Sequence, residues 1–360
     1  MPDAPLALAR TYLDAYRATA DARLAAVLAD SEARLAGLPF GAARYHAALR
    51  EFTLRGGKRL RGALVVLGCE ACGGDAALAL GPSLSLELLH ADFLAYDDFM
   101  DRDELRRGGR ALHMLAGDVA RAHGSRDPEH RGVSAMLLLG LVAQSLAFAE
   151  LARAPLADGP RARALAYLSS LVEGVAVGQL LDVSAADFPS ASAAELAEIH
   201  RRKTGLYTTE GPLVLGALVA GGVEGDARLA ALRAYALPLG EAFQIVDDVL
   251  GVAGDPAETG KPDASDLREG KHTAVLEAAL ERLGGPRRER LVALARRPLD
   301  AAEAAEARAL IESSGAIDLA KARAHALAAA ARAVLDAAPL DARAKATLAS
   351  LSWLVVERRS

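Results

Sequence analysis

Glycine and proline breaks divide this chain of 360 residues into long runs of strong helix formers. Alanine, leucine, arginine and glutamate dominate these runs, and a helix costs each of them little free energy. No stretch shows the sustained alternation of β-branched and aromatic residues that a half-buried strand requires. The length alone would allow two domains, but no Pro/Gly/Ser linker divides the chain. The sequence therefore predicts one all-α domain over residues 1–360, with about a dozen helices.

Three segments indicate where helices end and which are buried. Residues 318–339 read as one helix that a proline ends, because proline cannot continue a helix. Residues 193–205 are expected to form a helix after the capping candidate Ser192 and to end at Gly205. Residues 132–149 carry no charge and approach the length of a membrane span, but they contain serine, glutamine and glycine. A fully buried helix in a bundle is favoured over a membrane span.

Charge and composition argue against several classes of protein. The net charge is −5 and only 4% of residues are aromatic, so no nucleic-acid partner is expected. The first residues lack a basic start and an apolar run, so they do not resemble a signal peptide, and a cytoplasmic protein is expected. Cys69 and Cys72 have the spacing of a redox pair or half a zinc site. No second cysteine pair exists, so two small buried thiols on a helix are favoured.

The acidic segment "LAYDDFMDRDELRRGGR" at residues 94–110 is the first candidate site. On a helix, Asp97 and Asp101 share one face, where their carboxylates repel each other. His90 and Phe93 fall on the same stripe, which argues against the alternative of a solvated acidic face. Mg²⁺ takes one or two carboxylates and completes its octahedron with waters and phosphate oxygens. The pattern therefore favours a cavity wall that binds a metal-bridged phosphorylated ligand.

A second acidic pair occurs near residue 250. Asp247 and Asp248 lie on an apolar segment, and Lys261 and Lys271 follow in polar sequence. Both acidic helices are explained together if they face one cavity that holds a diphosphate and its metals. The basic residues would then bind the oxygens that the metals leave free.

A basic cluster, "LRGGKRLRGAL", lies upstream of the first acidic segment. Arg55, Lys58 and Arg61 recur every three residues and are expected to share a helix face. Gly56 and Gly57 would let the backbone approach an anion closely. A surface cluster is the alternative, but this position suggests a second phosphate site.

Together these segments resemble the trans-isoprenyl diphosphate synthases, or polyprenyl synthetases. The motifs "GGKRLR", "ELLHADFLAYDDFMDRDELRRGG", "GVAVGQLLD", "RKTGLYT", "FQIVDDVLGVAGDPAETGKP" and "DLREGKHT" follow the family's order over nearly the whole chain. As a set they are highly specific. The resemblance implies the isoprenoid synthase fold, a helical bundle around a central apolar cavity, and a homodimer without a membrane span.

The resemblance also implies roles for individual residues. The side chains expected to bind isopentenyl diphosphate are Lys58, Arg61, His90 and Arg107. Those expected at the allylic diphosphate are Arg106, Lys203, Thr204, Gln244, Lys261 and Lys271. The expected metal ligands are Asp97, Asp98, Asp101, Asp247 and Asp248, with about three Mg²⁺ ions in each active site.

The implied reaction is a prenyl transfer without a protein nucleophile. Metals and cations stabilise the departing diphosphate, so that the allylic carbon–oxygen bond ionises. The double bond of isopentenyl diphosphate attacks the carbocation, and a proton is then lost, with the released diphosphate as its acceptor. Arg106, Lys203, Thr204 and Gln244 are the expected catalytic residues, and a dry apolar pocket keeps water from the cation. The allylic substrates would be dimethylallyl, geranyl or farnesyl diphosphate.

Four positions depart from the family's pattern. Gly251 stands where the second acidic motif usually has its third aspartate, so water or Asp255 would replace that ligand. Leu141 replaces an aspartate, and Gly62 replaces a proline. The unexpected Asp92 has a helical angle well away from the face of Asp97, so it is expected to point elsewhere.

Phe93 is expected to set the product length. It lies one turn deeper than Asp97, where its ring would block a growing prenyl chain. A C15 to C20 product is expected, with geranylgeranyl diphosphate favoured over farnesyl diphosphate. A terpene cyclase and an inactive regulatory partner are the alternatives, but the second diphosphate site and the retained charged residues argue against them. The final segment, "SWLVVERRS", is expected to be a solvated tail rather than a cover of the site.

Overall fold

The structure is a computed structural model that describes residues 4–185, 195, 198–199, 201–254, 267–268, 273–295, 297 and 299–358. These residues contain 14 α-helices, one π-helical segment and a two-stranded hairpin, so the all-α prediction is confirmed. The helices of the first half are α1 (Ala4–Ala33), α2 (Ala42–Leu54), α3 (Leu60–Ala71), α4 (Ala76–Met100), α5 (Leu112–Ala122), α6 (Pro128–Arg153) and α7 (Asp158–Ala185). Those of the second half are η1 (Arg201–Glu210, the π-helical segment), α9 (Gly211–Val219), α10 (Ala227–Ala253), α13 (Ala274–Arg282), α14 (Gly285–Leu294), α15 (Ala301–Ser314), α16 (Ala316–Ala337) and α17 (Ala342–Val356). The hairpin strands are β1 (Leu105–Arg106) and β2 (Gly109–Arg110).

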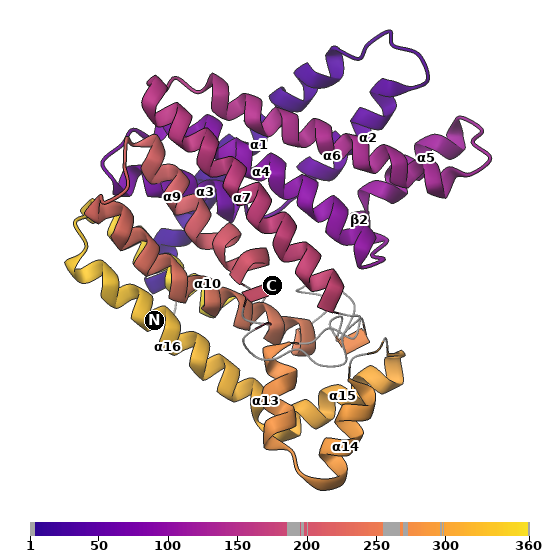
Figure 1. Ribbon diagram of the computed structural model, residues 1–360, viewed down its shortest axis with the longest axis vertical. Helices are drawn as coiled ribbons and strands as arrows, with labels where there is room; N and C mark the ends of the chain where they lie inside the picture. The colour runs from indigo at the N-terminus through magenta and orange to yellow at the C-terminus, as the bar shows by residue number, and fades with distance from the viewer. Residues whose placement is uncertain are drawn as a thin grey trace.

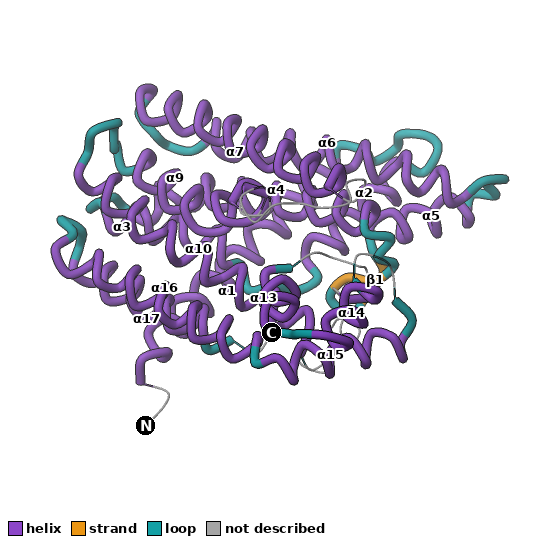
Figure 2. The backbone as a smooth tube through the Cα atoms, turned by 60° about the horizontal axis from the view of Figure 1, so that its bottom comes forward, coloured by secondary structure: helices purple, strands orange, loops and turns teal. Residues whose placement is uncertain are grey.

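The helices pack around α4 and α10, which carry the two acidic pairs. Helix α4 lies between α3 and α6, while α10 packs on η1, α9 and α16 (Figure 1). Helices α6 and α7 run along one outer side of the bundle, and α16 and α17 lie on the opposite side (Figure 2). Helices α13, α14 and α15 form a smaller group beside the end of α10 and have an apolar cluster of their own.

Local capping signals explain several helix ends. Helix α16 ends at Ala337, two residues before Pro339, as predicted. Helix α15 begins with a capping box. The side chain of Asp300 accepts hydrogen bonds from the backbone N–H groups of Ala302 and Glu303, and the side chain of Glu303 accepts one from the backbone N–H of Asp300. The predicted helix end at Gly205 is wrong, because η1 continues through this glycine into α9. A Cβ atom at Gly240 on α10 would lie 2.7 Å from Oγ1 of Thr209 and 3.3 Å from the Cα atom of Gly205, so a side chain there would displace part of η1.

The basic cluster does not form the predicted helix face. Helix α2 ends at Leu54 and α3 begins at Leu60, so Arg55 and Lys58 lie in the connecting loop and only Arg61 is helical. Gly56 and Gly57 have φ angles of 62° and 121°, which favour glycine and end the helix. A spacing of three residues therefore mimicked a helical face across a turn.

The prediction that residues 132–149 are fully buried is also wrong. Leu137, Leu138 and Leu141 on α6 are 49%, 64% and 55% exposed. Helix α7 likewise exposes Leu180 and Val183. In the described part of the chain, α6 and α7 are the two helices long and apolar enough to cross a membrane, and 39% and 28% of their most apolar stretches are buried. The outer side of the bundle therefore carries an exposed apolar surface, which we call the α6–α7 face.

The two cysteines are buried thiols, as predicted. Cys69 lies on α3 and Cys72 caps it, and neither forms a disulfide. Burial raises the pKa of Cys69 to about 12 and that of Cys72 to about 11. Neither is therefore poised as a thiolate for redox chemistry or metal binding.

Candidate active site

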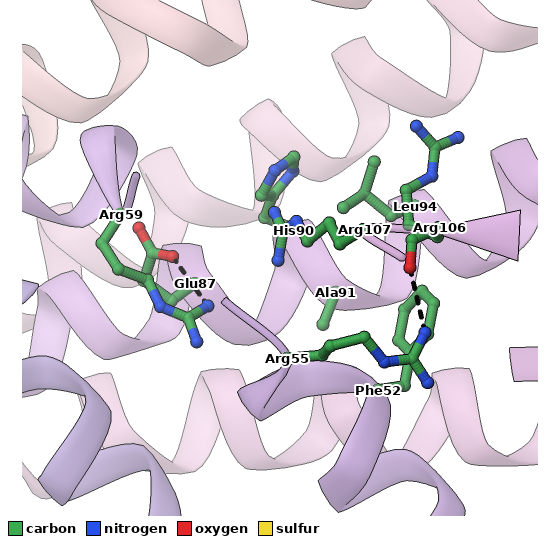
Figure 3. Close-up of a pocket in the computed structure, with 9 residues that line it drawn as sticks. All are labelled: Phe52, Arg55, Arg59, Glu87, His90, Ala91, Leu94, Arg106 and Arg107. Atoms are coloured by element: carbon green, nitrogen blue, oxygen red, sulfur yellow. Dashed lines mark hydrogen bonds and ion pairs between the residues drawn. The ribbon is translucent and has the colours of Figure 1, made fainter. Parts of the chain in front are cut away.

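A short hairpin presents two arginines at the end of α4. Arg107 and Gly108 form its two-residue turn with φ angles of 52° and 72°, the left-handed values that such a turn requires. The side chains of Arg106, the last residue of β1, and Arg107, the first residue of the turn, diverge. The guanidinium of Arg107 extends beside His90, whereas that of Arg106 turns away from it (Figure 3). Two adjacent residues therefore serve different parts of the site.

The buried Asp98 holds Arg106. Its Oδ1 atom accepts a hydrogen bond from Nε of Arg106 at 2.5 Å and also forms an ion pair with this guanidinium. Burial raises the pKa of Asp98 to about 6, although the charge of Arg106 opposes this shift. Burial acts most strongly on Arg106 and would lower its pKa, but the ion pair and hydrogen bond with Asp98 and the charges of Asp97 and Asp103 together raise this pKa. The structure thus places Asp98 where it orients an arginine.

Asp97 and Asp101 lie one turn apart at the end of α4. The backbone N–H of Asp101 donates to the carbonyl of Asp97 at 2.8 Å, so the two residues share a helix face as predicted. The side chain of Asp97 is 25% exposed, and its Oδ1 atom accepts from Nε2 of Gln179 on α7 at 3.2 Å. Nη2 of Arg106 lies 4.0 Å from Oδ2 of Asp97. Asp97 is therefore oriented from two sides while its carboxylate stays accessible to a ligand.

The second acidic pair shows the same division between a buried and an exposed aspartate. Asp248 is 3% exposed and accepts from Nε2 of Gln244 at 2.7 Å and from the backbone N–H of Ala274 at 3.2 Å. These bonds tie α10 to the start of α13. Asp247 instead has a side chain that is 54% exposed. Of this pair, Asp247 is the one that can meet a ligand directly.

The C-terminal segment lies against this site. Arg358 donates to Oδ1 of Asp247 at 3.0 Å and to the carbonyl oxygen of Phe243 at 2.9 Å. Its guanidinium also stacks 3.9 Å above the ring of Phe243. The expectation of a solvated tail is wrong, because this cation contacts both an acid and an aromatic face.

Arg61 on α3 and His90 on α4 contact each other in the site. Nη2 of Arg61 donates to Oγ1 of Thr208 at 2.8 Å, and Nη1 lies 3.3 Å from Nε2 of His90. Burial, reinforced by Arg61, lowers the pKa of His90 well below its usual value, so this imidazole is neutral. Nε of Arg61 is buried without a hydrogen-bond partner. These groups can therefore donate to an anion, and the low pKa makes His90 a weak proton acceptor.

Positive charges crowd the space between the hairpin and α3. The pKa of Arg107 is lowered to about 10, mainly by loss of water and next by the charge of Arg59. Loss of water and the charge of Arg358 also lower the pKa of Lys58. A pocket between these residues is lined by Arg55, Arg59, His90, Arg106 and Arg107, together with apolar side chains and Glu87 (Figure 3). Such a cationic pocket favours an anion with several oxygens.

Phe93 forms an apolar wall beside these polar groups. Its ring packs edge-on against Tyr207, with centroids 5.2 Å apart and planes at 73°. The guanidinium of Arg61 lies 4.8 Å from the centroid of the same tyrosine. Tyr207 is 3% exposed, and its hydroxyl donates to the carbonyl of Leu86 at 3.3 Å. The site therefore joins an anion-binding side to a dry aromatic side.

Several of the predicted residues cannot be placed. The side chains of Lys203 and Thr204 lie outside the described part of the structure, as do Asp255, Lys261 and Lys271 entirely. The capping candidate Ser192 also lies outside it. Sequence reasoning assigned no role to several residues that contact the site, among them Gln179, Thr208 and Arg358. Gln179 and Thr208 lie within motifs of the family resemblance, whereas the ion pair of Arg358 had no signal in the sequence.

The structure gives a reason for the departure at position 62 and places those at positions 92 and 141. The backbone N–H of Gly62 donates to Oε1 of Glu87 at 2.8 Å, a bond that proline cannot make. Asp92 is 1% exposed and lies between α4 and α6, beside Gly140, so it points away from Asp97 as predicted. Leu141 lies on the exposed α6–α7 face, outside the site.

The acidic residues fit Mg²⁺ only when a ligand shares in holding it. Among the described residues, no three carboxylate, histidine or cysteine side chains form a metal site by themselves. Accessible carboxylates such as Asp97 and Asp247 are nevertheless the hard oxygen donors that Mg²⁺ prefers. Since Mg²⁺ commonly takes one or two carboxylates and completes its shell with water and phosphate, this donor set suits a bound diphosphate.

Comparisons with known proteins identify the family of this chain. The profile of the polyprenyl synthetase family matches residues 42–312. The short chain isoprenyl diphosphate synthase of Methanothermobacter thermautotrophicus is 33% identical over 242 residues, which are 66% of this chain and 68% of that protein. The geranylfarnesyl diphosphate synthase of Aeropyrum pernix is 32% identical over 309 residues, 84% of this chain and 91% of its own. A solved geranylgeranyl pyrophosphate synthase from Corynebacterium glutamicum, in complex with isoprenyl diphosphate and magnesium, is 32% identical with a TM-score of 0.90 and covers 96% of this chain and 99% of its own.

Proposed function

Because the chain belongs to the polyprenyl synthetase family, we propose that it condenses isopentenyl diphosphate with an allylic diphosphate, which is dimethylallyl, geranyl or farnesyl diphosphate. The divergence of Arg106 and Arg107 from one hairpin turn carries this proposal. Arg106 stands beside the accessible acid Asp97, while Arg107 extends toward His90. A single hairpin would thus bind two diphosphates at different places, which a condensation of two such substrates requires.

The allylic diphosphate is assigned to the acidic side. Asp97, Asp101 and Asp247 would hold Mg²⁺, with about three ions in each site. When bound, Mg²⁺ neutralises charge on the diphosphate and so helps it to leave. Asp98 and Asp248 stay proposed as members of the two metal-binding motifs, and their hydrogen bonds would also orient Arg106 and Gln244 beside the metals.

The departing diphosphate also needs cations and donors from the protein. Arg106 supplies one fixed cation, and Lys203, Lys261 and Lys271 are proposed to supply others. Dipoles of Thr204 and Gln244 would stabilise the allylic cation without capturing it. We assign no protein base, because the neutral His90 contacts a guanidinium and a low pKa leaves it a weak proton acceptor.

Isopentenyl diphosphate is assigned to the basic side. Lys58, Arg61, His90 and Arg107 would bind its oxygens, and the partnerless Nε atom of Arg61 offers a donor that is already free of water. The neighbouring rings of Phe93 and Tyr207 would keep water from the reacting carbons.

A C15 to C20 product, with geranylgeranyl diphosphate as the main one, fits the aromatic wall. Phe93 packs firmly on Tyr207 and lies one turn before Asp97, so its ring would end the space for a prenyl chain. The similarity to a geranylgeranyl pyrophosphate synthase supports C20. Farnesyl diphosphate is the alternative product. An inactive partner or a terpene cyclase is less well supported, because neither needs two separate diphosphate sites.

We also propose that the chain is a single domain and acts as a cytoplasmic homodimer. The apolar clusters around α4 and α10 share Tyr12 and Tyr167, which supports one continuous domain. The α6–α7 face contains the exposed side chains Leu137, Leu138 and Leu141. An exposed apolar surface of this kind usually marks a site where another molecule binds. A second copy of the chain would cover this face without a membrane.

The test is incubation of the purified protein with Mg²⁺, isopentenyl diphosphate and each allylic starter, followed by mass spectrometry. Linear C15 to C20 diphosphates are expected. The Asp97→Asn variant should lose most of this activity, whereas Asp14→Asn, at an exposed ion pair on α1, should keep it. Cyclic hydrocarbons from the allylic substrate alone would indicate a cyclase, and no product from any starter would contradict the synthase.

A further inference from the structure

The hairpin that carries Arg106 and Arg107 is held by Arg55, which lines the same pocket. Nη1 of Arg55 donates to the carbonyl oxygen of Arg106 at 3.0 Å and to that of Arg110 at 2.8 Å. Figure 3 shows the first of these bonds, which joins the loop after α2 to the hairpin. Nη2 forms an ion pair with Glu51 one turn earlier on α2, so the guanidinium itself is fixed. One cation therefore binds one carbonyl on each strand of the hairpin.

Gly109 leaves room for this guanidinium because it has no side chain. A Cβ atom at position 109 would lie 2.3 Å from Cζ of Arg55 and 2.5 Å from its Nε atom. Any side chain there would displace Arg55 or the strand. Gly108 is required for a different reason, since its φ angle is 72° and a Cβ atom there would meet nothing within 4 Å. The two adjacent glycines thus have separate functions.

The contact is reciprocal, because the hairpin also binds the loop. Nη1 of Arg107 donates to the carbonyl oxygen of Gly56 at 2.8 Å. A Cβ atom at Gly57 would lie 2.9 Å from the same Nη1 atom, so this glycine admits the arginine. The loop at residues 55–58 and the hairpin therefore fix each other, each through an arginine that binds backbone carbonyls.

We propose that Arg55 is a positioning residue of the condensation, which fixes the hairpin so that Arg107 is presented to the non-allylic diphosphate. The inference rests on the proposed function. Arg106 has a second anchor, the buried Asp98, and so keeps its place when the hairpin loosens. Arg107 contacts the loop that Arg55 holds, and it has no such buried acid among its described bonds. Loss of Arg55 therefore affects the two substrates unequally.

The first test is steady-state kinetics of the Arg55→Ala variant in the full-length protein with Mg²⁺. The KM for isopentenyl diphosphate should rise about tenfold or more, because small displacements of positioning groups have effects of this size, while the KM for the allylic substrate should change less than about threefold. Arg50→Ala is the matched control, since it removes an ion pair with Glu32 from the same helix without touching the hairpin. Equal changes in both KM values, or none, would overturn the proposal.

Two further measurements separate positioning from general stability. Millimolar guanidinium chloride should partly restore the KM of Arg55→Ala, whereas a variant that is merely less stable would not recover.

Gly109→Ala should raise the same KM in the wild-type background but have little added effect in Arg55→Ala, where the new methyl group has room. Additive effects of the two substitutions would refute the contact. Should Arg55→Ala fail to fold, Arg55→Lys, which keeps the charge but loses the planar fork, gives the same comparison.

These results are distinguishable from failure of the proposed function. If the wild-type protein makes no prenyl product from any starter, the proposed function fails before Arg55 is tested. If the wild-type protein is active and the variant keeps both KM values, only the inference about Arg55 fails.

Discussion

The buried carboxyl group of Asp92 should make the protein less stable as pH rises, and Asp92→Asn should remove this effect. Asp92 is 1% exposed, and its Oδ1 atom has no hydrogen-bond partner. Burial raises its pKa from 3.8 to about 6, and the nearby hydroxyl of Tyr96 opposes this shift only in part. Asparagine has the same shape, so it should fit against Gly140 without a new clash.

The size of the effect follows from the two pKa values. A group that binds its proton more tightly in the folded state contributes stability below its unfolded pKa and loses it as pH rises through the folded pKa. For Asp92 this loss falls between about pH 4 and pH 6. The difference from 3.8 to about 6 corresponds to about 3 kcal/mol of unfolding free energy. Asp92→Asn should therefore match the wild type near pH 4 and exceed it by up to about 3 kcal/mol above pH 7.

Urea denaturation of both proteins at several pH values measures this difference. Asp14→Asn is the control, because the side chain of Asp14 is 66% exposed in a surface ion pair, which contributes about 0.5 kcal/mol or less at any pH. A stability difference between wild type and Asp92→Asn that does not change with pH would refute the reasoning about burial.

Three other substitutions test separate parts of the structure. Phe93→Ala should lengthen the main product by one or more C5 units in mass spectrometry, while Phe99→Ala, an exposed residue near the same helix end, should not; an unchanged product would contradict the role of the aromatic wall. Gly62→Pro should lower the unfolding free energy by about 3 kcal/mol or more. It loses the hydrogen bond to Glu87, and its Cβ atom would lie 1.9 Å from the hydroxyl of Tyr16. An unaltered midpoint of urea denaturation would argue against this. Leu138→Glu on the α6–α7 face should shift the protein from dimer toward monomer in analytical ultracentrifugation, and an intact dimer would exclude this face as the interface.

Local patterns in the sequence were enough to predict the helices and one face of the site. The four-residue spacing of Asp97 and Asp101 fixes their shared face as soon as the segment is helical. Proline and capping residues likewise predict where helices such as α16 end. The loop after α2 shows the limit of such patterns. Arg55, Lys58 and Arg61 have a helical spacing, but the left-handed angles of the glycines between them break the helix.

Roles that depend on contacts between distant segments could not be predicted. The sequence pairs Asp97 with Asp98 and Asp247 with Asp248, but the depth of each side chain depends on how α4 and α10 meet their neighbours. The ion pair between Arg358 and Asp247 joins positions 111 residues apart, and no local pattern encodes it. The exposed side of α6 could not be predicted either, because apolar composition alone does not distinguish a buried core helix from an interface helix.

The most direct test of the central claim is the stoichiometry of the reaction. With Mg²⁺, an allylic starter and labelled isopentenyl diphosphate, the protein should release one diphosphate for each labelled C5 unit that enters a linear product. Omission of isopentenyl diphosphate should nearly abolish this release. Diphosphate release at full rate from the allylic substrate alone, or the absence of labelled product, would contradict a site that joins two diphosphate substrates.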